Sequence, residues 1–159
     1  KHYETIERGC KTMRLVYILD QKNGLLFNKR RQSKDSILID NVIQKVNEVE
    51  NATLWLSDYS RELFVDSGLE LKDINELSLA EASDKDFIFI EDVSVDIQDV
   101  LENRESNHYL YLYKWNKVYP ADKRLDVTED YFNHFEVLST ETFEGNSHEE
   151  IYLEEWRTV

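Results

Sequence analysis

The residues best suited to chemistry lie in a basic segment, residues 28–35 (NKRRQSKD), in which four of eight side chains are Lys or Arg. Guanidinium groups are forked donors for phosphate or carboxylate, and a helix beginning at this point would add free backbone N–H groups. The alternative is that these cations pair with surface carboxylates, for about 0–1 kcal/mol each. The first interpretation predicts an anion site formed by Asn28, Arg30, Arg31, Gln32, Ser33 and Asp35.

A second cluster, residues 114–124 (KWNKVYPADKR), combines aromatic, amide and charged side chains. Trp beside Lys or Arg is common at binding hot spots and stacks on planar ligands, so Trp115, Asn116 and Tyr119 are candidate ligand contacts. In the other interpretation, Trp115 only completes the core and Tyr119 forms a turn with Pro120.

His148 follows Ser147 in the segment GNSHEE, residues 145–150, which invites an acid–base or nucleophilic role. Neighbouring residues in an extended segment point to opposite faces, so Ser147 and His148 share a site only if the chain turns there. We expect a surface turn, and we keep His148 as a candidate ligand contact beside residues 28–35.

Signatures of metal and nucleotide chemistry are missing from the sequence. The other histidines, His2, His108 and His134, have no metal-ligand spacing, and no Walker loop, GxGxxG or GxSxG motif occurs. We therefore expect neither a metal nor a cofactor.

Strands and helices that would position these residues alternate along the chain. Residues 14–19 (RLVYIL) form a nearly continuous apolar run, typical of a strand buried on both faces. The next element is a helix with Ser33 or Ser36 as its N-cap, because its apolar residues recur at helical spacing. This stripe consists of Ile39, Val42, Ile43 and Val46.

The remaining elements complete an α/β pattern. Strands are predicted at 53–56, 69–71, 87–90 and 109–113, and an antiparallel pair at FEVLST and EEIYLEEW. Helices are predicted at DYSRELF, capped near Asp58 or Ser60, and at 74–82 and 95–101. The fold expected is a single three-layer α/β domain, with a mainly parallel sheet, a C-terminal antiparallel hairpin and helices on both faces.

Composition sets the broad class of the protein. Hydrophobic residues make up 41% of 159, enough for one core, and the lone Cys10 cannot form an internal disulfide. No apolar stretch approaches the length of a membrane span, so we expect a soluble, cytoplasmic protein. Residues 1–12 precede the only methionine, Met13, and we expect an upstream or added segment before a domain at 13–159.

The net charge of −14 is unevenly distributed. Residues 1–35 hold nine Lys or Arg against four Asp or Glu, whereas residues 36–159 hold ten against 29. Such a body repels nucleic acid and anionic membranes and attracts basic proteins, although solubility alone also explains an acidic surface.

The order of these parts resembles dihydrofolate reductases over residues 13–159. The likeness rests on the first strand with Asn23-Gly24 and a polar loop before a helix, on TLWLS followed by a short helix, and on the closing strands YLYLYKW, FEVLSTETFEG and EEIYLEEW. The resemblance implies a reductase scaffold with a substrate-facing acid near Asp35, and Asp40 one turn further along.

Three departures from that family affect its chemistry. Residues 29–32 replace the family's Leu-Pro-Trp, and Ser57-Asp58 stand at its cofactor-binding Gly-Arg. Glu91-Asp92 replace the Gly-Gly that lets a pyrophosphate approach backbone amides. A carboxylate about 4 Å from a pyrophosphate costs about 1 kcal/mol even in water, so we expect the reductase chemistry to be lost.

Two functions remain open. One is an interaction protein of inhibitor or immunity type that binds a basic partner, such as a toxin or a nucleic-acid-binding enzyme, through its acidic body and its tyrosines. These tyrosines are Tyr109, Tyr111, Tyr113, Tyr131 and Tyr152, which we expect to be exposed. The alternative is a small enzyme or binding protein for a phosphorylated or anionic molecule at residues 28–35, with Trp115, Asn116 and His148 converging on it.

Overall fold

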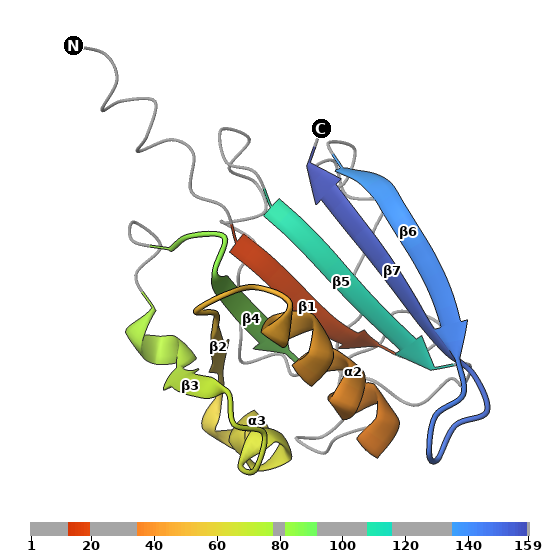
Figure 1. Cartoon of the computed structure of the whole chain (residues 1–159), viewed down its shortest axis with the longest axis horizontal. Helices are drawn as coiled ribbons and strands as arrows, with labels where there is room; N and C mark the ends of the chain where they lie inside the picture. Colours follow the sequence, from red (N-terminus) through yellow and green to blue (C-terminus); the bar gives the residue numbers. More distant parts are fainter. Residues whose placement is uncertain (1–12, 20–34, 78–81, 92–107, 116–134, 159) are drawn as a thin grey trace.

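The computed structural model describes residues 13–19, 35–77, 82–91, 108–115 and 135–158. They form a seven-stranded sheet of order β3-β2-β4-β1-β5-β7-β6 (Figure 1). Its strands are β1 (Met13–Leu19), β2 (Thr53–Leu56), β3 (Glu70–Asp73), β4 (Asp86–Ile90), β5 (His108–Trp115), β6 (Phe135–Phe143) and β7 (Ile151–Thr158). The helices are α2 (Ser36–Asn47), α3 (Asp58–Arg61) and two single 3₁₀ turns, η1 (Glu62–Phe64) and η2 (Ile74–Glu76).

The sheet is parallel through its first five strands and antiparallel at one edge. Strand β1 pairs in parallel with β4 and β5, and β2 pairs in parallel with β3 and β4. Strand β7 runs antiparallel between β5 and β6. The predicted α/β fold, with a mainly parallel sheet and a C-terminal antiparallel pair, is confirmed.

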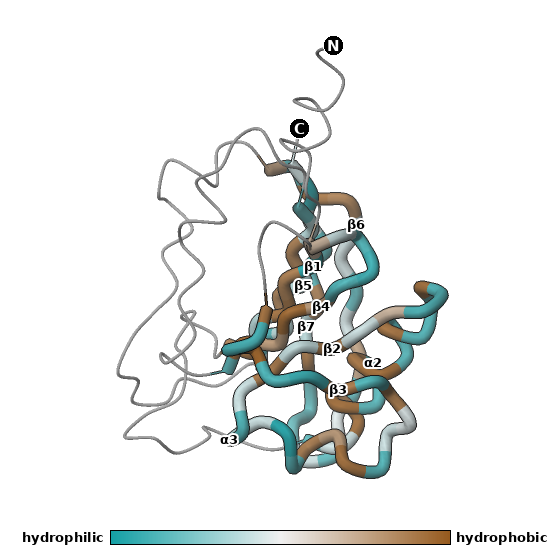
Figure 2. The backbone as a smooth tube through the Cα atoms, turned by 90° about the vertical axis from the view of Figure 1, so that its left-hand side faces the viewer, coloured by the Kyte–Doolittle hydropathy of each residue, from teal (hydrophilic) through white to brown (hydrophobic). Residues whose placement is uncertain are grey.

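The core lies on both faces of the central strands, which are coloured as hydrophobic in Figure 2. In β1 alternate side chains enter opposite clusters: Leu15, Tyr17 and Leu19 one, Val16 and Ile18 the other. All five are buried, as the continuous apolar run predicted.

Helix α2 covers one face of the sheet through Leu38, Val42 and Val46, which are buried in the same cluster as Val16 and Ile18. Ile39 and Ile43, the other two members of the predicted stripe, are half-buried and pack against that cluster. Leu38, which the prediction did not include, is buried. The predicted stripe is therefore rotated by about one residue.

Both predicted helix caps were wrong by one position or more. Asp35, and not Ser33 or Ser36, is the N-cap of α2, because its carboxylate accepts bonds from the backbone N–H groups of Ile37 and Leu38. Ser57, and not Asp58 or Ser60, caps α3 through a bond from the Ser60 N–H.

Instead of a helix over 74–82, the described residues form only the turn η2, after which Leu77 is extended. The helix predicted at 95–101 lies outside the described residues.

Tyr111 and Tyr113 are buried, because they face the cluster under α2, so the expectation that they are exposed was wrong. Tyr109 and Tyr152 are half-buried, and Tyr131 lies outside the described residues.

Within the described part of the chain, no helix has both the length and the apolar character needed to cross a membrane.

Candidate functional site

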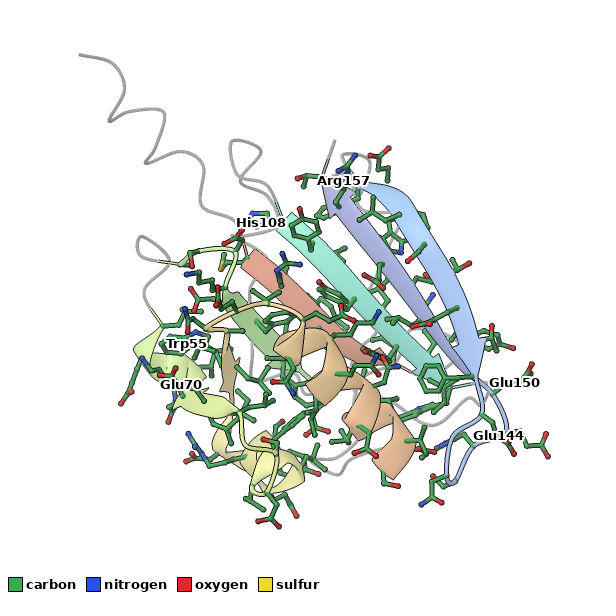
Figure 3. The ribbon with its side chains drawn as sticks, in the orientation of Figure 1. Trp55, Glu70, His108, Glu144, Glu150 and Arg157 are labelled. Atoms are coloured by element: carbon green, nitrogen blue, oxygen red, sulfur yellow. The ribbon has the colours of Figure 1, made fainter. Side chains whose placement is uncertain are left out.

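Buried polar side chains mark the edge of the sheet at which the parallel strands end. Asp35 precedes α2, Ser60 lies in the helix that follows β2, Glu91 directly follows β4, and His148 precedes β7. In open α/β sheets this carboxyl edge is where ligands bind, so these residues form the candidate site. Figure 3 shows Glu144 and Glu150, which flank the β6–β7 loop, at the opposite end of that strand pair from Arg157.

Asp35 is the most highly bonded residue of the site, with 1% of its surface exposed. Besides the two helix N–H groups, its carboxylate accepts bonds from the backbone N–H groups of Asn146 (2.9 Å), Ser147 (2.8 Å) and His148 (3.2 Å). The Ser147 hydroxyl adds a bond of 3.1 Å. The carboxylate therefore joins the start of α2 to the β6–β7 loop.

Hydrogen bonding keeps this buried carboxylate ionised. Burial alone would raise the pKa of Asp35, but bonds from the Asn146 and Ser147 backbone, the His148 ring and the Leu38 backbone outweigh it, and the pKa falls well below its ordinary value. A carboxylate so bonded has no acceptor position left for a substrate.

His148 lies between Asp35 and Trp115. Its Nδ1 is 3.3 Å from the Asp35 carboxylate and therefore donates to it, and its ring stacks on Trp115 with centroids 4.7 Å apart and planes 11° apart. The Ser147 hydroxyl oxygen is also close to Nδ1, at 3.2 Å. A serine nucleophile and its orienting acid must use different imidazole nitrogens, so this trio is not a catalytic triad.

Gly145 makes this arrangement sterically possible. A Cβ at this position would lie 2.5 Å from both Asp35 Oδ2 and Ile151 Cδ1. The Gly145 N–H also donates to the His148 carbonyl at 2.9 Å, which forms the turn. The turn lets Ser147 and His148 contact one carboxylate although they are adjacent in sequence. The expected surface turn exists, but His148 in it is 4% exposed, so its surface assignment was wrong.

Glu91 forms the second bonded carboxylate of the edge. It is 5% exposed and accepts a bond of 2.6 Å from the Ser60 hydroxyl, which ties the end of β4 to α3. The sequence indicated Glu91 only as a replacement for glycine, and Ser60 only as a possible helix cap. Their pairing, between residues 31 positions apart, has no local signal.

Of the residues predicted to contact a ligand, the structure brings Asp35, Trp115 and His148 together. The others lie outside the described residues: Asn28, Arg30, Arg31, Gln32, Ser33, Asn116 and Tyr119. Asp92 does too. Whether any of these binds a ligand stays a prediction.

Backbone donors at the start of α2, which the predicted anion site would use, already have partners within the chain. The N–H groups of Ile37 and Leu38 already bond to Asp35, and the Ile39 N–H bonds to the Asp35 carbonyl. These three N–H groups are therefore not available to an approaching anion, because Asp35 already accepts from them. Over the described ranges, no group of three His, Cys, Asp or Glu side chains is placed to hold a metal ion.

Comparisons with known proteins identify the fold. No protein-family model and no curated protein matches the chain. Among solved structures, the dihydrofolate reductase of Enterococcus faecalis, complexed with NADP(H) and RAB-propyl, matches with a TM-score of 0.60 and 10% identity. The match covers 95% of this chain and 97% of that one. The resemblance seen in the order of the strands is thus confirmed at the level of structure: the chain has a dihydrofolate reductase-like fold.

Proposed function

We propose that this chain is an acidic interaction protein, of inhibitor or immunity type, that uses a reductase-like scaffold without reductase chemistry to bind a basic protein. The observation that carries the proposal is the internal use of both carboxylates at the carboxyl edge, Asp35 and Glu91, while many other carboxylates are exposed.

The residues at the edge do not suit reductase chemistry. The family resemblance implies a substrate-facing acid at Asp35, but this carboxylate bonds to five residues of its own chain. Glu91 stands where the family has a glycine that admits a pyrophosphate, and its buried carboxylate would repel that group. The described residues therefore do not fit a nicotinamide nucleotide bound in the family's manner.

The exposed surface carries the charge that a basic partner would meet. Exposed carboxylates occur on α2, beside α3 and along β6, among them Asp40, Asp66 and Glu136. Ion pairs such as Lys45–Glu155 and Lys114–Glu154 neutralise only some of the acidic residues in a chain of net charge −14. The surplus accelerates association with a cationic surface.

The alternative, a protein for an anionic small molecule at residues 28–35, is favoured by the approach of Trp115 and His148 to Asp35. It is weakened because the donors at the start of α2 are already bonded. We therefore favour the interaction protein.

The test is to capture partners from native lysate, identify them by mass spectrometry and measure association by stopped flow. For a basic partner, the association rate should fall at least tenfold between about 20 and 150 mM salt, with dissociation nearly constant. Glu50→Gln should slow association and Lys85→Gln, a matched exposed change of opposite sign, should accelerate it. Recovery of no basic protein, or an association rate independent of salt, would overturn the proposal.

A further inference from the structure

A groove of about 410 Å³ lies between α2 and the segment that follows α3, with the β6–β7 loop at one end. Its apolar lining consists of Ile39 and Ile43 from α2, and Leu63 and Val65 from the opposite wall. Val65 is 66% exposed, so its apolar surface is open to a ligand in the groove. The volume falls within the range of about 300–1,000 Å³ typical of ligand sites.

The polar lining of the groove is acidic on both walls. Asp40 lies on α2 beside the apolar stripe, and Glu62 and Asp66 line the opposite wall of the groove. Both Asp40 and Asp66 are exposed, and neither forms an ion pair or hydrogen bond within the described ranges. No Lys, Arg or His belongs to the lining that the structure describes. The groove thus differs from the Asp35 site, whose carboxylate is fully bonded.

An apolar floor with carboxylates on both sides selects for a particular chemistry. Lys and Arg side chains bury aliphatic stems against apolar surface while their charged ends stay hydrated or paired. A guanidinium in the groove would have carboxylates on both walls as partners, whereas an anion would meet repulsion from both walls. A second copy of this chain, at net charge −14, is disfavoured for the same reason.

We propose that this groove binds an Arg or Lys side chain of the basic partner, with the stem on the four apolar lining residues, Val65 among them, and the cation between Asp40 and Asp66. The inference rests on the proposed function, because it names the surface through which the partner is held. It assigns the groove, and not the edge of the sheet around Asp35, as the contact that gives specificity.

The direct test uses n-butylguanidinium as a mimic of the arginine side chain, and n-butylurea as its neutral analogue. In ¹⁵N–¹H spectra of the whole chain, n-butylguanidinium should shift the amides of Ile39, Asp40, Leu63 and Asp66 in a saturable way, and the urea should not. Shifts spread evenly over the exposed carboxylates, or equal shifts with both probes, would overturn the assignment.

Matched variants separate the groove from net charge. Asp40→Asn with Asp66→Asn should weaken n-butylguanidinium binding about three- to tenfold. Glu50→Gln with Glu149→Gln makes the same charge change at exposed positions outside the groove lining, and should change binding less than twofold. Val65 belongs to the apolar lining on which the stem would lie. Val65→Ser should therefore weaken the binding of n-butylguanidinium but not that of guanidinium itself, since only the former has an aliphatic stem. Equal losses in both double variants would contradict the proposal.

The captured partner then distinguishes the two proposals. A partner that binds the wild type and the groove double variant equally would refute the groove as its docking site and leave the interaction function standing. If no basic partner is captured, the interaction function fails, and the fragment titration still decides whether the groove binds cations.

Discussion

At the residue scale, Asp35 shows how a carboxylate in an apparently functional place serves structure. It caps α2 and holds a loop more than one hundred positions away in sequence, with His148 separated from it by 113 residues. Each carboxylate oxygen accepts several hydrogen bonds, and only 1% of the residue's surface is exposed. The cost of burying the charge is offset by these donors and by the positive end of the helix dipole.

Replacing this carboxylate tests that role. Asp35→Asn should lower the free energy of unfolding by about 2–4 kcal/mol, because an amide has one acceptor oxygen and brings unwanted donors among bonded N–H groups. Asp40→Asn, the same change at an exposed position of α2, should have little effect on stability. Urea unfolding measures both, and equal stabilities would contradict the bonding described.

The contribution of Asp35 to the free energy of unfolding should depend on pH. The folded pKa lies below the unfolded value near 3.8, so the stabilisation is complete above about pH 5 and is lost as the pH falls below about 4. The difference in unfolding free energy between wild type and Asp35→Asn should therefore shrink between pH 5 and pH 2.5. A difference independent of pH would show that ionisation is irrelevant.

Gly145 provides a steric test of the same contact. Gly145→Ala would force a methyl group against Asp35 and Ile151, and should cost about 1–3 kcal/mol of stability. Gly68 is the comparison position: its φ is +80°, and nothing lies within 4 Å of an added Cβ. A substitution there tests backbone strain without steric crowding. Gly68→Asn should recover stability relative to Gly68→Ala, because Asn tolerates this conformation, whereas Gly145→Asn should be no better than Gly145→Ala. Thermal unfolding distinguishes the two patterns.

At the element scale, α2 is held on the sheet by apolar packing and by polar contacts along its length. The Tyr113 hydroxyl of β5 donates to the Asn41 side chain at 2.6 Å. Near the end of the helix, Lys45 pairs with Glu155 of β7 at 3.1 Å and Glu141 of β6 at 3.8 Å. Burial would lower the pKa of Lys45, but the Glu155 hydrogen bond and charge outweigh it and raise that pKa. These contacts fix which way α2 lies across β5, β7 and β6.

The Tyr113 contact can be tested with one atom removed. Tyr113→Phe should cost about 1 kcal/mol at neutral pH, because it leaves the half-buried Asn41 oxygen without this donor. Burial, followed by the Glu155 and Glu141 charges, raises the pKa of Tyr113 in the folded chain. Wild-type stability should thus decrease above about pH 10, where the unfolded chain ionises, and the difference from the variant should narrow. Tyr152→Phe, at a surface hydroxyl, serves as the control and should not change stability.

At the scale of the whole molecule, the reductase-like fold is combined with an edge of the sheet that the chain closes with its own side chains. The β6–β7 loop bonds to Asp35, and Ser60 bonds to Glu91. The fold alone therefore does not imply the family's activity, because activity depends on the groups at the site.

Because the chain's own side chains bond to the carboxylates at this edge, we predict that NADPH will not stabilise the protein. NADPH at a hundred times its dissociation constant would stabilise a binding protein by about 2.7 kcal/mol, an easily measured rise in Tm. We expect no such rise with millimolar NADPH, because the family resemblance places Glu91 where the family has a glycine that admits the pyrophosphate. A dihydrofolate reductase measured in parallel is the positive control. A clear rise for this chain would restore the reductase interpretation.

Local patterns in the sequence determined the elements and their order. The runs at β1, β4 and β5 are apolar on both faces, and the 3.6-residue period of α2 is clear. Such patterns involve residues close together in sequence, so they can be recognised without the tertiary structure. The pattern failed at residues 74–82, where apolar spacing resembled a helix but the described chain forms one 3₁₀ turn.

Only the tertiary structure decided what the polar residues do. Asp35, Ser147 and His148 meet because the strand order brings the β6–β7 loop to the start of α2. No local rule relates residues separated by more than one hundred positions, so neither the identity of the cap nor the burial of His148 could be predicted. The same contact gives a structural role to the residue that the resemblance made a substrate-facing acid, since a carboxylate can bind a substrate only with acceptor positions that its own chain leaves free.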